Sequence, residues 1–102
     1  MNKKLVVRLF RSEDQEVVFI NDKKVACEYE LSFDDVMAAV AEAVTQEKPE
    51  KLVYERYWSD TWLIDEKYFR EEPDLNVEGI RVNSLEDYLD NSEKISEPFG
   101  GY

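Results

Sequence analysis

The stretch VACEYELSFDDVMAAVAEAVTQEKP, residues 25–49, decides the fold. In residues 25–31 apolar and polar side chains alternate with a period of two, which is typical of a half-buried strand. From Phe33 onward the apolar residues recur three or four positions apart, which is the period of a helix with one apolar stripe. The change of period at Ser32 therefore predicts a strand that leads directly into a helix.

The predicted helix carries signals at both ends. Ser32 precedes it as an N-cap, and Asp35 at the third helical position completes a weaker form of the capping box. Pro49 ends the helix, because proline lacks the backbone N–H that a helix interior needs. The apolar stripe, which we expect to face the core, consists of Phe33, Val36, Met37, Val40 and Val44.

Two further strands are predicted before this stretch. Residues 4–10 and 17–20 are apolar and rich in β-branched side chains, and the polar residues 12–16 separate them. Residues 21–24 form a turn signal, because Asn and Asp adopt left-handed conformations readily. Together with residues 25–31, these segments predict an antiparallel β-meander.

The chain beyond the helix predicts shorter elements. Residues 52–58 and 61–69 are expected to form two strands around a turn at Ser59 and Asp60. Residues 77–82 predict a short strand, in which Gly79 weakens the strand or marks a β-bulge. A short second helix follows, capped by Ser84 and extending through Leu89.

These elements predict an α+β fold: an antiparallel β-meander with one main helix packed on it, further strands and a short C-terminal helix. We expect residues 1–90 to form a single domain, because 102 residues is about the size of one domain. Residues 91–102 are expected to form a flexible C-terminal tail.

The composition excludes several classes of function. The chain has no His and one Cys, so it cannot build a Ser-His-Asp triad or the usual structural zinc sites. The single Cys27 alternates with apolar strand residues, which indicates a buried packing residue and not a nucleophile. The N-terminus lacks the pattern of a signal peptide, and no stretch approaches the about 18 apolar residues of a membrane span, so we expect a cytoplasmic protein.

The acidic motifs do not predict a metal, cofactor or catalytic site. The pattern Asp74-x-Asn76-x-Glu78-Gly79 is similar to the first half of an EF-hand calcium loop, but Leu85 stands where such a loop needs a bidentate Glu. Adjacent carboxylates on a strand, such as Asp65 and Glu66 in the expected strand 61–69, point to opposite faces and make a poor acid–base pair. With 3 Gly in all, the chain offers no glycine-rich phosphate loop.

An aromatic segment is the most informative feature for function. Within residues 54–69 lie Tyr54, Tyr57, Trp58, Trp62, Tyr68 and Phe69, with Arg56 among them. Tyr, Trp and Arg are enriched at the centres of protein–protein interfaces. Alternation would present Tyr54, Arg56 and Trp58 together on one face. The alternative, that these aromatic residues simply fill the core, stays open at this stage.

The net charge of −11 indicates the kind of partner. Carboxylates around exposed aromatic residues would complement a basic protein surface, whereas direct binding to nucleic acid relies on Lys and Arg. The candidate partner-binding residues are Tyr54, Glu55, Arg56, Trp58, Asp60, Trp62, Asp65 and Glu66.

The sequence thus favours a non-enzymatic binding protein that acts as a stoichiometric inhibitor or adaptor. Its partner would be basic, for example a nuclease or another nucleic-acid-binding protein, and its carboxylates would occupy sites that phosphates otherwise use. This composition is similar to that of small phage anti-defence proteins such as anti-CRISPR proteins, and of bacterial immunity proteins and antitoxins. Two alternatives remain: a small ligand-binding or enzymatic domain that uses carboxylates and Tyr, and an oligomeric structural protein.

Overall fold

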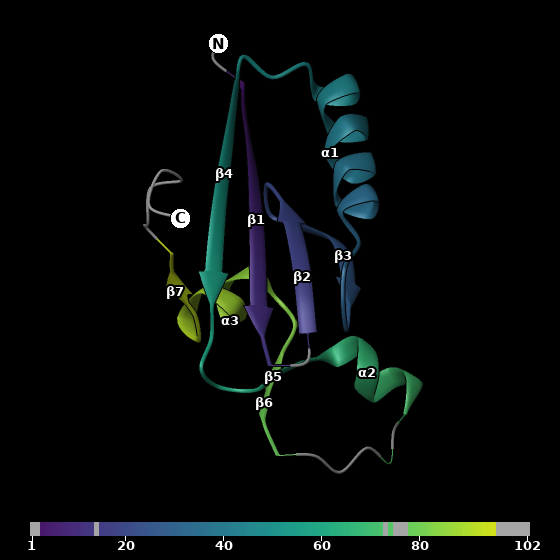
Figure 1. The fold of residues 1–102 in the computed structure, drawn as a ribbon, viewed down its shortest axis with the longest axis vertical. Coiled ribbons are helices and arrows are strands. Elements are labelled where there is room, and N and C mark those ends of the chain that lie inside the picture. The colour runs from purple at the N-terminus through teal and green to yellow at the C-terminus, as the bar shows by residue number, and fades with distance from the viewer. Residues whose placement is uncertain (1–2, 14, 73, 75–77, 96–102) are drawn as a thin grey trace.

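The computed structural model describes residues 3–13, 15–72, 74 and 78–95. Ten elements follow one another along the chain (Figure 1). They are β1 (Lys4–Ser12), β2 (Gln15–Ile20), β3 (Lys23–Glu28), α1 (Phe33–Glu47), β4 (Lys51–Trp58), β5 (Leu63–Asp65), α2 (Glu66–Glu71), β6 (Ile80–Val82), α3 (Leu85–Asp90) and β7 (Glu93–Lys94). The fold is α+β, as the sequence predicts.

The main sheet is mixed. Its strand order is β3-β2-β1-β4-β7, and β1, β2 and β3 form the predicted antiparallel meander. Helix α1 then carries the chain back along the sheet, so that β4 lies parallel to β1 (Figure 1). Strands β5 and β6 form a separate two-stranded parallel sheet.

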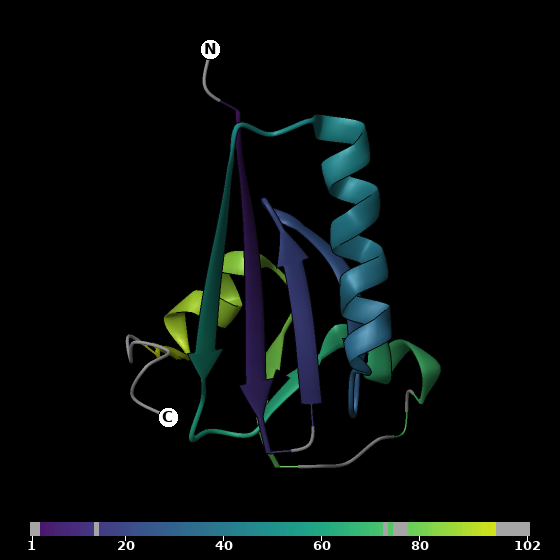
Figure 2. The ribbon, with the colours of Figure 1, turned by 45° about the horizontal axis from the view of Figure 1, so that its top comes forward.

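Helix α1 confirms both predicted boundaries. The Ser32 hydroxyl accepts a hydrogen bond of 3.1 Å from the backbone N–H of Asp35, which satisfies one of the free donors of the first turn. The helix ends at Glu47, and Lys48 adopts a left-handed conformation just before Pro49. The helix lies on one face of the sheet, where it contacts β1 and β2 (Figure 2).

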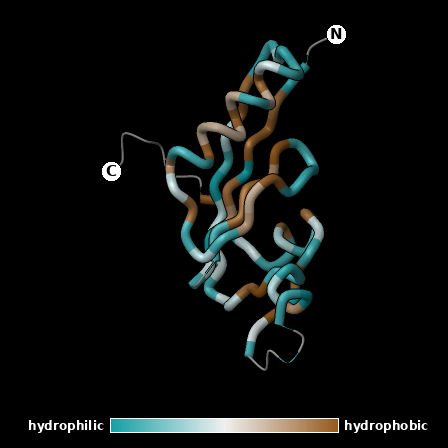
Figure 3. The backbone as a smooth tube through the Cα atoms, turned by 90° about the vertical axis from the view of Figure 1, so that its right-hand side faces the viewer, coloured by the Kyte–Doolittle hydropathy of each residue, from teal (hydrophilic) through white to brown (hydrophobic). Residues whose placement is uncertain are grey.

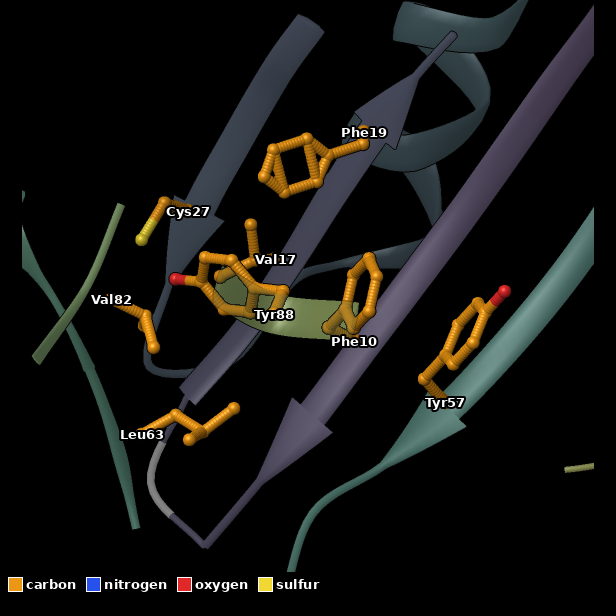
Figure 4. Close-up of a cluster of buried hydrophobic side chains, with 8 residues drawn as sticks. All are labelled: Phe10, Val17, Phe19, Cys27, Tyr57, Leu63, Val82 and Tyr88. Atoms are coloured by element: carbon orange, nitrogen blue, oxygen red, sulfur yellow. The ribbon is translucent and has the colours of Figure 1, made fainter. Parts of the chain in front are cut away.

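The opposite face of the sheet carries the larger core, which is rich in aromatic rings. The rings of Phe10 and Tyr57 stack with 4.6 Å between their centroids (Figure 4). Phe19 meets Phe10 edge-on, and Tyr88 is tilted against Phe10 and edge-on to Phe19. Tyr88 comes from α3 and is fully buried, so the last helix covers this face of the sheet.

The predicted strand over residues 61–69 is wrong. Only Leu63–Asp65 is extended, as β5, and it pairs with β6 instead of forming a hairpin with residues 52–58. The cause is local: the Asp65 carboxylate accepts a hydrogen bond of 2.9 Å from the backbone N–H of Lys67 and caps a helix, α2, that begins at Glu66.

The predicted short strand over residues 77–82 is present as β6, although residue 77 lies outside the described residues. Gly79 directly precedes it with a φ of 157°. A side chain at this position would come within 2.7 Å of the Ile64 side chain, so the glycine allows β6 to pack closely on β5.

The C-terminal part contains the predicted second helix and one further strand. Ser84 caps α3, as the sequence predicts, and the structure adds a full capping box with Asp87. Residues 93–94 of the expected tail form β7, which pairs with Tyr57 and Trp58 at the edge of β4. The rest of the expected tail, residues 96–102, lies outside the described residues. Within the part of the chain described, no helix is long and apolar enough to cross a membrane.

Candidate interaction surface

Strand β4 directs its side chains alternately into two environments. Tyr57 is buried in the aromatic core, whereas Tyr54 and Trp58 on the other face are 46% and 43% exposed. Leu52 shares that open face and is 54% exposed. The aromatic segment is therefore divided: Tyr57 belongs to the core, and Tyr54 and Trp58 belong to the surface.

A groove lies between this open face of β4 and helix α1, and we call it the α1–β4 groove. Its volume is about 470 Å³. Among the ten residues that line it, only Glu16 is charged. The lining consists of Val7, Leu9, Glu16, Leu31, Phe33, Val36, Met37, Val40, Leu52 and Tyr54.

The apolar stripe of α1 explains why the groove is open. The side chains that pack on the sheet include Ala39 and Ala43, whose small size lets the helix approach closely. Phe33 and Met37 consequently lie at the margin of the helix–sheet contact and are 76% and 47% exposed. Hydrophobic positions recur along α1, and within the described residues no second helix covers them (Figure 3). The prediction that the whole stripe faces the core is wrong for Phe33 and Met37 and for Val44, which is 38% exposed.

The groove lining is almost without free charge. Glu16 forms an ion pair of 2.9 Å with Arg11 and also accepts a hydrogen bond from the backbone N–H of Leu31. Burial raises the pKa of the Tyr54 phenol, so this side chain stays neutral at physiological pH. An apolar ligand surface could therefore enter the groove with little desolvation of charged groups.

An acidic pocket lies at the C-terminal end of β4, and we call it the Trp58 pocket. Its volume is about 310 Å³, and its lining includes Trp58, Asp60, Asp90 and Glu93. The indole N–H of Trp58 donates a hydrogen bond of 2.9 Å to Asp60, and Glu93 on β7 is the strand partner of Trp58. Three carboxylates and one half-exposed indole ring thus line the same pocket.

The predicted site residue Glu55 lies on the opposite face of β4. Its carboxylate accepts hydrogen bonds from Arg8 at 3.0 Å, Lys94 at 2.9 Å and the Tyr57 hydroxyl at 3.0 Å. The bond from Lys94 is the largest of the effects that lower the pKa of Glu55, and it outweighs the opposing effect of burial. Glu55 therefore joins β1, β4 and β7 and is not part of the groove.

Three other predicted site residues also lie apart from the open face. Asp65 is fully buried, so its carboxylate is not available to a partner. Glu66 begins α2 and pairs with Arg70 one helical turn later at 3.9 Å. Trp62 is half-buried just before β5, where its carbonyl accepts the backbone N–H of Ile80. The structure therefore places Tyr54, Arg56 and Trp58 on one face, with Asp60 bonded to Trp58.

Several residues of the surface are not predicted by the sequence. The spacing of Phe33 and Met37 matches a helix stripe and so predicts that they face the core, whereas the alanines beside them indicate that the helix packs off-centre. Asp90 and Glu93 join the Trp58 pocket only because β7 pairs with β4, and no local pattern predicts a two-residue strand.

A buried polar network is the second candidate site. Asp65 accepts hydrogen bonds from Lys24 at 2.8 Å and from the Tyr88 hydroxyl at 2.7 Å, and Gln15 donates to the same hydroxyl at 2.9 Å. Burial, and next the hydrogen bond to Asp65, raises the pKa of Tyr88 far above its ordinary value. Both Asp65 oxygens already have partners and the side chain is enclosed, so the network is built to hold the fold and not to receive a ligand.

Among the residues that the structure describes, the remaining chemical groups offer no further site. Cys27 is buried, as predicted, and burial raises the pKa of its thiol to about 11, so the thiol is protonated at physiological pH. Within the described residues, no group of three Asp, Glu or Cys side chains could hold a metal ion. The calcium-like pattern at residues 74–79 lies partly outside the described residues, because 75–77 are not among them.

No protein-family model, curated protein or solved structure matches this chain. The functional argument therefore depends on the geometry of the α1–β4 groove and the Trp58 pocket.

Proposed function

We propose that this protein is a non-enzymatic binding module that docks the α1–β4 groove and the Trp58 pocket onto a protein partner. The observation that carries the proposal is the exposure of Phe33, Leu52 and Tyr54 along one apolar groove. Large side chains of this kind are costly to leave in water when they are contiguous, and such patches mark interaction sites. Tyr and Trp are also the residues that most often anchor interfaces.

The charge of the chain supports a basic partner. A protein with a net charge of −11 repels acidic surfaces and attracts basic ones over a distance of about 10 Å at ordinary salt. A nucleic-acid-binding protein presents such a basic surface, and carboxylates could occupy its phosphate sites. The protein would then act as a stoichiometric inhibitor, of the anti-defence, immunity or antitoxin type, in the cytoplasm, where its free thiol would stay reduced.

The enzymatic alternative has less support. Its best candidate is the network of Asp65, Tyr88 and Lys24, whose hydrogen-bonding groups are already paired inside the protein. A catalytic site needs polar groups that converge on a space for the substrate. The α1–β4 groove is open but apolar, which suits docking better than chemistry.

The test is affinity capture from cells that naturally express the protein, with groove variants as the comparison. Phe33→Ala and Leu52→Thr remove exposed apolar area while keeping good helix and strand formers, so the fold should be retained. Val25→Thr is the matched control, because Val25 is exposed on β3, on the other side of α1.

We expect a basic protein to co-purify in equimolar amount with the wild type and with Val25→Thr, and to be lost with both groove variants. Each groove variant should weaken the purified complex at least about tenfold in calorimetry. Equal recovery with all variants would show that the groove is not the binding site, and an acidic partner would contradict the charge argument.

A further inference from the structure

The groove and the pocket together define the shape of the segment that binds. We infer that the partner inserts an amphipathic helix into the α1–β4 groove and places a Lys or Arg side chain of that helix in the Trp58 pocket. This inference rests on the proposed function, and it adds the conformation and the sequence pattern of the partner segment.

The walls of the groove favour a helix. Phe33 and Met37 project from α1 on one side, Leu52 and Tyr54 from β4 on the other, and β1 provides an apolar floor. An amphipathic helix buries one apolar stripe in such a groove while its backbone stays fully hydrogen-bonded. A helix laid there would pack beside α1 on the same face of the sheet, which is the usual way in which a sheet face is covered.

The spacing along β4 sets the length of this helix. Leu52 and Trp58 are six residues apart on an extended strand, which corresponds to about 20 Å. A helix rises 1.5 Å per residue, so it needs about 13 residues to reach from one to the other. Its apolar side chains would stand at positions i, i+3, i+4 and i+7, and the basic residue about one turn beyond the last of them.

The charges of the Trp58 pocket specify the basic residue. The carboxylates of Asp60, Asp90 and Glu93 line the Trp58 pocket, and no ion pair among the described residues engages them. A guanidinium or ammonium group there would gain charge-assisted hydrogen bonds and could stack on the half-exposed indole of Trp58. An acidic pocket beside an exposed Trp therefore complements a cation better than any neutral group.

The lining of the groove thus carries one charged side chain, Glu16, and the acidic Trp58 pocket follows beyond Arg56 on the same face of β4. A second copy of this chain is a poor occupant, because two molecules of net charge −11 repel each other. A basic partner helix meets both conditions, since its apolar stripe fits the groove and its cation fits the pocket.

The test uses a display library of 18-residue helix-forming peptides, with all surface positions randomised, selected on the full-length protein. We expect enriched peptides to share apolar residues at i, i+3, i+4 and i+7 followed by Lys or Arg. Their affinity should fall at least tenfold with Phe33→Ala. Asp90→Asn combined with Glu93→Gln should reduce affinity only for peptides that carry the basic residue, and Val25→Thr should change nothing.

A photo-crosslinking residue at position 33 identifies the occupant directly. A crosslink to the selected peptide supports the inference. A crosslink to a second copy, or to residues 96–102 of the same chain, would overturn it and assign the groove to that segment. Selection of extended peptides, or of no peptide, would also overturn the inference, whereas the proposed function would still stand if the natural partner binds through the groove in affinity capture.

Discussion

Asp65 connects parts of the chain that are far apart in sequence. Its carboxylate accepts hydrogen bonds from Lys24 on β3, from Tyr88 on α3 and from the first turn of α2. Its own backbone N–H donates to Gln15 on β2 at 2.8 Å. One buried side chain therefore fixes the small helices against the main sheet, and its loss would leave several polar groups without partners.

We predict that Asp65→Ala destabilises the fold by about 3 kcal/mol or more, because the ammonium group of Lys24 loses its carboxylate partner and the buried hydroxyl of Tyr88 loses its acceptor. Urea denaturation followed by circular dichroism measures this change. Glu66→Ala is the control, since its weak ion pair one turn along α2 should contribute less than about 0.5 kcal/mol. Equal midpoints for the two variants would contradict the structural role of Asp65.

Cys27 makes the stability sensitive to alkaline pH. Burial, and next the charge of Asp65, raises the pKa of the thiol from its ordinary 9.0 to about 11 in the folded state. The folded protein therefore holds this proton more tightly than the unfolded chain. Its contribution to stability is complete below about pH 9 and is lost as the pH rises toward 11.

We expect the urea midpoint of the wild type to fall between pH 9 and pH 11, and to fall less steeply in Cys27→Val, which fills the site without an ionisable group. Burial raises the pKa of Tyr88 far above its ordinary 10.0, so Tyr88 adds a decline of its own above about pH 10 in both proteins. Parallel curves for the two proteins would show that the thiol does not contribute.

At the scale of single elements, helix α1 shows what sequence can and cannot predict. Ser32 and Pro49 set its ends through backbone chemistry that is local, and the structure confirms both. Which side of the stripe is buried depends on how close the helix comes to the sheet. That distance follows from Ala39 and Ala43, whose packing partners lie on distant strands.

We predict that two substitutions on the same stripe have opposite consequences. Val40→Asp should cost about 3 kcal/mol or more, because Val40 packs against the cluster of Leu5, Val7 and Ile20. Phe33→Ala should change stability by less than about 0.5 kcal/mol, since Phe33 is largely exposed and Ala favours helix. Thermal melts decide, and a comparable loss in both variants would mean that the whole stripe is buried.

The segment after β4 marks where local patterns mislead. Trp62, Ile64, Tyr68 and Phe69 are all good strand formers, and they predict one continuous strand. The capping bond of Asp65 competes with that preference and starts α2 instead. The interaction surface could be predicted only in part. The alternation along β4 predicts that Tyr54 and Trp58 share one face. No pattern within β4 indicates that Asp65 is buried or that α1 forms the other wall of the groove.

At the scale of the whole molecule, the sheet depends on contacts between segments that are far apart in the sequence. The return of β4 to lie beside β1, and of β7 to cover the end of β4, joins residues that are more than thirty positions apart. No local propensity encodes such pairings. The structure thus shows contacts between β4 and residues 93–94, which lie beyond the expected end of the domain at residue 90.

We predict that a chain ending at residue 95 is more stable than one ending at residue 90 by about 1–2 kcal/mol. The shorter chain loses the bond from Ile95 N–H to the Arg56 carbonyl, the ion pair of Lys94 with Glu55, and the bond from Ser59 to the Asn91 carbonyl. Urea midpoints measure the difference. Identical midpoints would place the end of the domain at residue 90 and make β7 dispensable.

The final prediction separates the long-range charge from the short-range groove. The net charge of −11 acts before contact, so it should govern how fast a basic partner arrives. The apolar side chains act only after contact, so they should govern how long the partner stays. With the captured partner on a biosensor surface, raising salt from about 0.05 to about 0.5 M should slow association at least tenfold and leave dissociation nearly unchanged. Phe33→Ala should do the reverse and speed dissociation by a similar factor.

Asp60→Lys should change both the association rate and the dissociation rate, because Asp60 is hydrogen-bonded to Trp58 and also adds to the acidic field. If salt and Phe33→Ala change the same rate constant, the prediction that charge governs association and the groove governs dissociation is wrong.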